Sequence, residues 1–172
     1  MPEYTLKYLV VGASEVGKTS LIKRYVEGEF TEGFKITIGV DFLTKIVQLP
    51  NAQGKTSRVT FQVWDIAGQA EFTNFSHLYM KNTHCVFLVF DLSRPETYNR
   101  LQNWKKQVVK TNPNVFCVVV GNKSDLVSSS PIPEDQVLSE LEPIDFFLTS
   151  AKTGSKVEET FILMGKKILS AI

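Results

Sequence analysis

Residues 12–19 read Gly-Ala-Ser-Glu-Val-Gly-Lys-Thr, which matches the spacing G-x-x-x-x-G-K-[ST]. The apolar run 8–11 precedes this segment and predicts a buried strand, while residues 18–27 favour a helix after it. Glycines let backbone N–H groups turn inward, and the helix N-terminus adds positive potential, so this strand-loop-helix unit suits a polyphosphate. An ordinary strand-turn-helix without a ligand is the weaker alternative, because eight residues match in the required setting.

Length and composition limit the classes of protein that this chain can be. The 172 residues predict a single domain, 1–172, that can bury a full core. A formal net charge of +1 and the absence of a basic stripe argue against a nucleic-acid partner. No apolar run approaches the roughly 20 residues of a membrane-spanning helix. Cys85 and Cys117 lie in apolar runs, so we expect reduced thiols and a cytoplasmic location.

Apolar runs alternate with segments of helical period along the chain. The expected strands are 4–11, 40–49, 57–65, 84–91, 115–121 and 145–149, and the expected helices are 18–27, 70–81, 95–110, 134–141 and 156–170. The continuously apolar runs 86–90 and 115–120 indicate parallel strands covered on both faces, whereas the alternation at 59–63 predicts an edge strand with one wet face. The pattern predicts an α/β fold: a P-loop NTPase three-layer sandwich with a six-stranded, mostly parallel sheet, one antiparallel edge strand and about five helices.

Three further motifs fall at the carboxyl ends of expected strands, where ligands bind in such sheets. They are Val-Trp-Asp-Ile-Ala-Gly-Gln at 63–69, Val-Gly-Asn-Lys-Ser-Asp at 120–125 and Thr-Ser-Ala-Lys at 149–152. With residues 12–19 and Thr-Ile-Gly-Val-Asp at 37–41, they make the chain resemble the small Ras-like GTPases over essentially its whole length. Residues 38–42 resemble the Rab branch, which regulates membrane traffic.

The resemblance implies a guanine nucleotide, GTP or GDP, in the site. Asp125 can accept bonds from guanine N1–H and its exocyclic amine, a donor pair that adenine lacks. In the family, Asn122 braces the phosphate loop, the Lys123 stem covers the base plane, Ala151 offers its N–H to guanine O6 and Phe30 covers the base edge. The other nucleotide contacts implied are Ser14, Glu15, Val16, Gly17, Lys18, Thr19, Ser20, Thr37, Gly68, Ser150 and Lys152. A polar turn after a strand is the alternative interpretation of 122–125.

Magnesium is the metal that the resemblance implies. Mg²⁺ prefers octahedral oxygen ligands and retains several waters. Thr19 and Thr37 hydroxyls, two phosphate oxygens and two waters complete that set, with Asp65 holding one of the waters. Thr37 belongs to a loop, so it holds the metal only while the γ-phosphate exists, and hydrolysis releases it.

Gln69, Lys18 and Thr37 are the implied catalytic residues. Lys18 reaches the β- and γ-phosphates and Gln69 orients the attacking water, since phosphoryl transfer depends mainly on positioning and charge stabilisation. The loop from Phe30 to Asp41 contains no arginine, so we expect slow turnover without an activating protein.

Partners are expected at the switch regions. Phe42, Trp64 and Tyr79 match the three aromatic residues that Rab proteins present to effectors, although core packing is an alternative interpretation. An exchange factor, a GTPase-activating protein and effectors are therefore implied. The chain ends at Ile172 with no cysteine for prenylation, so a membrane contact, on the cytosolic face of an endomembrane, requires a lipid tail that this chain lacks. A truncated chain is favoured over a protein that works without an anchor.

Three residues depart from the family pattern: Glu15, Ile66 and Ala70. Glu15 stands where the family has a small residue, and a carboxylate beside a polyphosphate weakens binding unless it points into solvent. We therefore expect faster nucleotide release from this protein than from a Glu15→Gly variant. Equal release rates, followed with a fluorescent GDP analogue, contradict this expectation.

Two rival functions remain. A guanine-nucleotide-binding interaction module with negligible hydrolysis is suggested by the three departures and opposed by the intact Gln69. In single-turnover assays, we expect Gln69→Leu to hydrolyse GTP more slowly than the wild type, and comparable rates favour the binding module. A small kinase lacks an evident acceptor site, and preference for adenine nucleotides would revive it.

Overall fold

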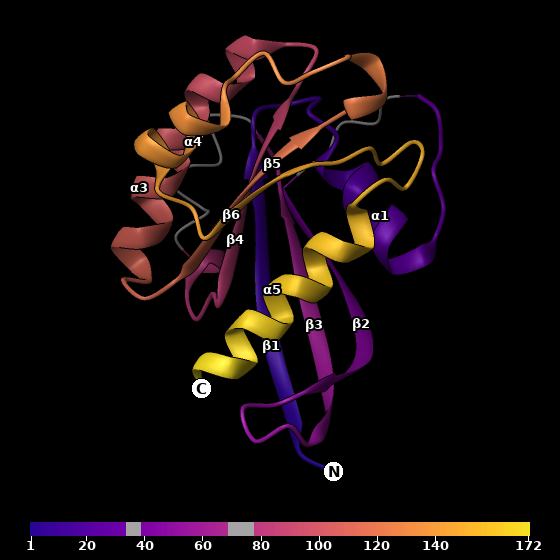
Figure 1. Cartoon of the computed structure of the whole chain (residues 1–172), viewed down its shortest axis with the longest axis vertical. Helices are drawn as coiled ribbons and strands as arrows, with labels where there is room; N and C mark the ends of the chain where they lie inside the picture. The colour runs from indigo at the N-terminus through magenta and orange to yellow at the C-terminus, as the bar shows by residue number, and fades with distance from the viewer. Residues whose placement is uncertain (34–38, 69–77) are drawn as a thin grey trace.

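The computed structural model describes residues 1–33, 39–68 and 78–172. A six-stranded sheet of order β2-β3-β1-β4-β5-β6 forms the middle layer. Helices α1 and α5 cover one face of this sheet and α3 and α4 cover the other (Figure 1). This arrangement confirms the predicted three-layer α/β sandwich.

The strands and helices follow closely the ranges expected from the sequence. The strands are β1 Glu3–Gly12, β2 Val40–Pro50, β3 Thr56–Ile66, β4 Cys85–Asp91, β5 Phe116–Asn122 and β6 Asp145–Leu148. The helices are α1 Lys18–Glu27, α3 Leu101–Thr111, α4 Glu134–Leu141 and α5 Val157–Ala171, with 3-10 turns η2 Pro95–Arg100 and η3 Ser124–Leu126. The segment expected as one helix over 95–110 thus divides into η2 and α3. Of the helix expected at 70–81, residues 78–80 are helical and 69–77 lie outside the described residues.

Strand β2 pairs antiparallel with β3, and the other neighbours in the sheet pair in parallel. The prediction that the strand containing Val59 and Phe61 lies at an edge is wrong, because β3 lies between β1 and β2. Its alternation has another cause: the helices that cover one face of the sheet bury Val59, Phe61 and Val63, while the intervening side chains on the other face stay partly exposed. Alternation therefore reports a half-covered face, and the edge strands of the described sheet are β2, which is antiparallel to its neighbour, and β6.

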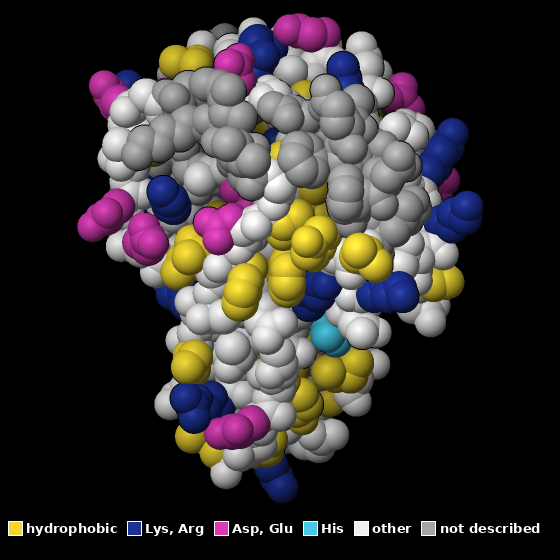
Figure 2. All heavy atoms as spheres, turned by 180° about the vertical axis from the view of Figure 1, so that it is seen from behind, with side chains coloured by type: hydrophobic (Ala, Val, Ile, Leu, Met, Phe, Trp, Pro, Cys, Tyr) yellow, Lys and Arg dark blue, Asp and Glu magenta, His cyan; other side chains and the backbone are white. Residues whose placement is uncertain are grey.

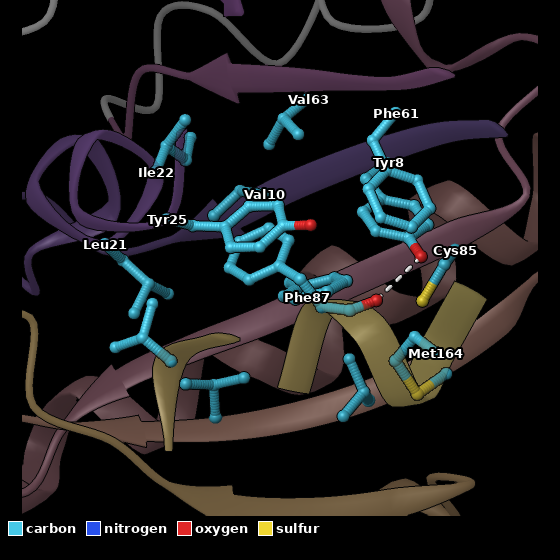
Figure 3. Close-up of a cluster of buried hydrophobic side chains, with 14 of the residues drawn as sticks. Tyr8, Val10, Leu21, Ile22, Tyr25, Phe61, Val63, Cys85, Phe87 and Met164 are labelled. Carbon is cyan, nitrogen blue, oxygen red and sulfur yellow. Dashed lines mark hydrogen bonds between the residues drawn. The ribbon is translucent and has the colours of Figure 1, made fainter. Parts of the chain in front are cut away.

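An aromatic cluster forms the core under α1 and α5 (Figure 3). Tyr8 stacks on Phe61 with 4.8 Å between ring centroids, and Tyr25 stacks on Phe161 at 4.2 Å. The Tyr8 hydroxyl donates to the Phe161 carbonyl at 3.0 Å, so the buried hydroxyl is satisfied. These contacts fix α1, which begins at the phosphate loop, against the sheet.

The second core lies under α3 and α4 and is aliphatic with a few aromatic rings, including Phe90, Tyr98 and Trp104. Cys85 packs into the first core and Cys117 into the second, and both thiols are buried and free. Burial raises the pKa of both thiols, which favours their protonated form. None of the helices in the described part of the chain is both long and apolar enough to cross a lipid bilayer.

Helix α5 packs tightly against the side chains of β2 and β3 at Gly165, and this contact generates a stability prediction. A Cβ at this position would lie 2.6 Å from Phe61 Cζ and 3.0 Å from Leu49 Cδ1. The Phe61 ring is held by Tyr8 and Tyr25 and has little room to move. We expect Gly165→Ala to lower the free energy of unfolding by about 1–3 kcal/mol through overpacking, although alanine favours helices by about 1 kcal/mol. Denaturant unfolding measures the change, with exposed Ser170→Ala in the same helix as control, and a stabilised Gly165→Ala variant contradicts the prediction.

Candidate nucleotide-binding site

A cleft of about 640 Å³ opens at the carboxyl end of the sheet, beside the N-terminus of α1. Most of the residues predicted to bind nucleotide line it. They are Ser14, Glu15, Gly17, Lys18, Thr19, Ser20, Phe30, Gly68, Asn122, Lys123, Asp125, Ala151 and Lys152. Segments separated by more than a hundred residues therefore meet at one concave surface, as expected for a ligand site.

The phosphate loop, residues 12–19, connects β1 to α1 at the floor of the cleft. Gly17 is the N-cap of α1 and has φ of 94°, a left-handed conformation that favours glycine. Lys18 is buried, and its amino group donates to the carbonyls of Gly12 and Ala13 at 3.1 and 2.7 Å. Burial lowers the pKa of Lys18 to about 8, and the Asp65 carboxylate partly opposes this shift. A bound phosphate would supply a stronger counter-charge for this amino group.

Gly68 packs directly against the phosphate loop. A Cβ at this residue would lie 2.5 Å from the backbone nitrogen of Ser14 and 2.6 Å from the Gly12 carbonyl oxygen. This backbone-to-backbone contact leaves no space for any side chain. The contact keeps Gly68, which follows β3, and its backbone N–H group at the phosphate end of the cleft.

Asn122, at the end of β5, connects three segments through one buried side chain. Its Nδ2 donates to the Val16 carbonyl at 3.0 Å, which holds the phosphate loop. Its Oδ1 accepts from the Thr149 hydroxyl at 3.1 Å and from the Ala151 N–H at 3.2 Å, which hold the loop after β6. The predicted bracing of the phosphate loop by Asn122 is thus present in the structure.

The base end of the cleft is formed by Asp125 and the loop after β6. The Ser150 hydroxyl donates to Asp125 Oδ1 at 2.6 Å and so orients this exposed carboxylate. From α1, Arg24 donates through Nε to the Ala151 carbonyl at 2.7 Å and through Nη2 to the Lys152 carbonyl at 2.5 Å. Hydrogen bonds with Asp125 and Arg24 therefore fix the position of the loop after β6.

Thr19 and Asp65 meet at the phosphate end of the site. The Thr19 hydroxyl donates to Asp65 Oδ2, and Asp65 is buried at the end of β3. Hydroxyl and carboxylate oxygens are the hard ligands that Mg²⁺ prefers. Among the described residues, no three His, Cys, Asp or Glu side chains are grouped so that they could hold a metal ion. The donor set therefore fits a metal held jointly by the protein and by phosphate oxygens.

Phe42, Trp64 and Tyr79 form an aromatic row beside the cleft. The rings of Phe42 and Trp64 stack at 4.9 Å, and those of Trp64 and Tyr79 lie 5.9 Å apart. Phe42 is 48% exposed, so simple core packing does not describe it. Figure 2 shows hydrophobic side chains gathered in a patch on the side of the molecule opposite to that seen in Figure 1. Lys7 supports the row from beneath: its amino group lies 4.6 Å from the Trp64 ring centroid and donates to the carbonyls of Tyr79 and Lys81.

Some predicted residues do not line the cleft. Val16 and Ser150 are buried, and they contribute a carbonyl and a hydroxyl to the hydrogen bonds described above. Asp65 lies beneath Thr19. Thr37 and Gln69 lie outside the described residues.

Sequence reasoning missed three polar residues that position the site. Arg24 holds the loop after β6. Arg94 donates to the Ser14 carbonyl of the phosphate loop, and Asp91, at the end of β4, accepts from Arg94. The position of Asp91 was the available signal, since it ends an apolar strand in the same way as Asp65 and Asn122. No spacing rule indicates the partners of the two arginines.

Comparison with known proteins agrees with this geometry. The model of the Ras family matches residues 7–170. The Ras-related protein RAB1BV of Beta vulgaris is 36% identical over 170 residues, covering 96% of this chain and 77% of the relative. The Ras-related proteins RABE1d and RABE1e of Arabidopsis thaliana are also 36% identical, with 96% of this chain and 76% of each relative covered.

The chain therefore belongs to the Ras family of small GTPases, proteins that bind guanine nucleotides and hydrolyse GTP. Within that family its relatives place it in the Rab branch, as residues 38–42 predict.

The junction at Asn122 generates a prediction. Asn122→Asp keeps the Oδ1 acceptor but replaces the Nδ2 donor with an oxygen, which faces the Val16 carbonyl and repels it. Losing a buried bond of this kind costs about 1–3 kcal/mol, so we expect GDP release to accelerate about tenfold or more. Release of a fluorescent GDP analogue measures the effect. Asn103→Asp, the same change on an exposed part of α3, is the matched control. Unchanged release from Asn122→Asp shows that this bond does not brace the loop.

Proposed function

We propose that this protein is a magnesium-dependent guanine-nucleotide switch of the Rab type that acts in membrane traffic. The observation that carries the proposal is the convergence on one cleft of Lys18, from the phosphate loop, with Asn122 and Asp125, from the end of β5 and the turn after it. A phosphate-binding amine and a guanine-reading carboxylate then contact opposite ends of the same nucleotide.

Selection of guanine follows from Asp125. Its carboxylate accepts from guanine N1–H and the exocyclic amine, and Ser150 orients it for this contact. The Lys123 stem covers the base, and Phe30, which lines the cleft beside it, covers the edge. The Ala151 N–H faces guanine O6 and shares its hydrogen with Asn122. Adenine leaves the carboxylate without donors, which explains the exclusion of ATP.

Thr19 and Thr37 would hold magnesium together with oxygens of the β- and γ-phosphates, and Asp65 would hold a water ligand. The Thr19 hydroxyl, which donates to Asp65 in this structure, would be one of the metal's ligands. Bound magnesium would neutralise charge on the phosphates during transfer. Thr37 leaves when the γ-phosphate is lost, and this release is the switch.

Hydrolysis depends on Gln69, which orients the attacking water, and on Lys18, which stabilises charge on the β- and γ-phosphates. Gly68 adds a backbone N–H to the γ-phosphate. The loop from Phe30 to Asp41 carries no arginine, so GTP hydrolysis is slow until an activating protein supplies one. An exchange factor restores the GTP form.

Effectors bind the aromatic row of Phe42, Trp64 and Tyr79. Phe42 is exposed, whereas Trp64 and Tyr79 are partly buried. Accessible aromatic rings give large contact area at a small entropic cost, which makes them effective binding residues. The GTP form is recruited to the cytosolic face of an endomembrane, where these partners act.

The proposal predicts a change of base specificity in Asp125→Asn. The amide offers a donor where the carboxylate accepts, so guanine loses both contacts and xanthine, which carries a carbonyl at C2, gains one. We expect affinity for GDP to fall at least about a hundredfold, with two charged hydrogen bonds lost at about 1.5–3 kcal/mol each, while xanthosine diphosphate gains affinity.

Fluorescence titration with both nucleotides measures this exchange of specificity. Asp135→Asn, an exposed change of the same kind in α4, is the control. Retained GDP affinity in Asp125→Asn, or preference of the wild type for ATP, overturns the proposed function.

A further inference from the structure

An ion pair joins the phosphate loop to the segment that follows β4. Arg94 Nη1 lies 4.0 Å from Glu15 Oε2. Nη2 of the same guanidinium donates to the Ser14 carbonyl at 3.2 Å, and Nε donates to Asp91 Oδ2 at 3.0 Å. Three sides of one guanidinium thus contact the loop backbone, the loop's acidic side chain and a buried anchor.

The anchor, Asp91, is only 1% exposed and serves two cations. Lys123 Nζ lies 2.9 Å from its Oδ2 and also donates to the Glu15 carbonyl at 2.8 Å. Ser93 donates to Oδ1 through its N–H and its hydroxyl. Burial alone raises the pKa of Asp91, but the hydrogen bonds from Ser93, Lys123 and Arg94 outweigh it and hold the pKa below its usual value. A charged Asp91 therefore orients both cations toward consecutive carbonyls of the phosphate loop.

Glu15 is the charged residue of the phosphate loop that this arrangement neutralises. It is the one acidic residue in segment 12–19, it is among the residues that line the cleft, and its backbone is left-handed with φ of 66°. An unpaired carboxylate at this place repels the phosphates of a nucleotide. With Glu15 and Asp91 opposite Arg94 and Lys123, the four charges sum to zero.

We propose that Arg94 is a positioning residue for nucleotide binding, which directs the Glu15 carboxylate away from the phosphates and neutralises it. The inference rests on the nucleotide-binding function proposed above. From the sequence we expect the Glu15 carboxylate to weaken nucleotide binding. With Arg94 present this weakening is small, and it becomes large only when Arg94 is removed. The sequence-based comparison with Glu15→Gly then shows a small difference in the wild type and a large one in an Arg94→Ala background.

A double-mutant cycle tests the proposal. GDP release is measured with a fluorescent analogue for the wild type, Arg94→Ala, Glu15→Gln and the double variant. We expect Arg94→Ala to accelerate release about tenfold, and the same change in the Glu15→Gln background to accelerate it less than about threefold. Equal acceleration in both backgrounds means that Arg94 only ties the loop to Asp91, and this overturns the proposal, as does unchanged release from Arg94→Ala.

Salt dependence and a conservative variant separate charge from structure. The excess acceleration in Arg94→Ala is expected to shrink between about 0.05 M and about 0.5 M salt, because exposed charges are screened. Arg94→Lys retains the charge and is expected to restore slow release, at least in part. The proposal is overturned if the acceleration of GDP release in Arg94→Ala does not change with salt and Arg94→Lys accelerates release by the same factor.

Amide hydrogen exchange of residues 13–17 provides a readout that needs no turnover. In the GDP complex, we expect Arg94→Ala to exchange faster in this segment than the wild type, and the double variant to exchange at a rate nearer the wild type. Failure of the wild type to bind GDP overturns the proposed function itself. A wild type that binds GDP but shows no coupling between the two residues overturns only the role of Arg94.

Discussion

The site depends on one constraint: loops from distant parts of the chain must keep fixed positions around an anion that is itself mobile in solution. Asn122 meets this constraint with a single buried amide that bonds both the phosphate loop and the loop after β6. Buried amides of this kind are costly unless all their groups are satisfied, so their geometry is strongly specified. The distance between the phosphate end and the base end of the cleft is therefore set by the protein before the nucleotide arrives.

Two glycines and two lysines, together with the Asn122 amide, hold the phosphate loop in position. Gly17 leaves room for the Asn122 side chain, since a Cβ there would lie 2.4 Å from Nδ2, and Gly68 lets two backbones touch. Two lysines then contact the loop from both sides, the buried Lys18 inside and the partly exposed Lys123 outside. The loop is thus a preorganised electrostatic cradle, which is the arrangement that phosphoryl-transfer enzymes require.

Much of this could be predicted from the sequence because the informative signals are local. Hydrophobic period gave the strands and helices to within a residue or two at most ends, and motif spacing indicated Lys18, Asn122 and Asp125 as one site. Features that depend on tertiary packing could not be predicted from the sequence. The half-covered face of β3 produced the alternation expected of an edge strand, and the division at Pro95–Arg100 arose where Thr97 bonds back to the backbone of Asp91. Contacts of long flexible side chains, such as those of Arg24 and Arg94, are set by the assembled fold and follow no fixed spacing.

Lys7 has a consequence for the proposed effector surface. Its amino group bonds the carbonyls of Tyr79 and Lys81 and lies 4.6 Å from the centroid of the Trp64 ring, so it restrains the indole ring and the backbone that carries Tyr79. A flexible surface loses side-chain entropy when a partner binds, whereas this surface has already lost it during folding. Recognition at this proposed effector surface is then expected to depend on shape match, so that dissociation rates, more than association rates, distinguish one partner protein from another.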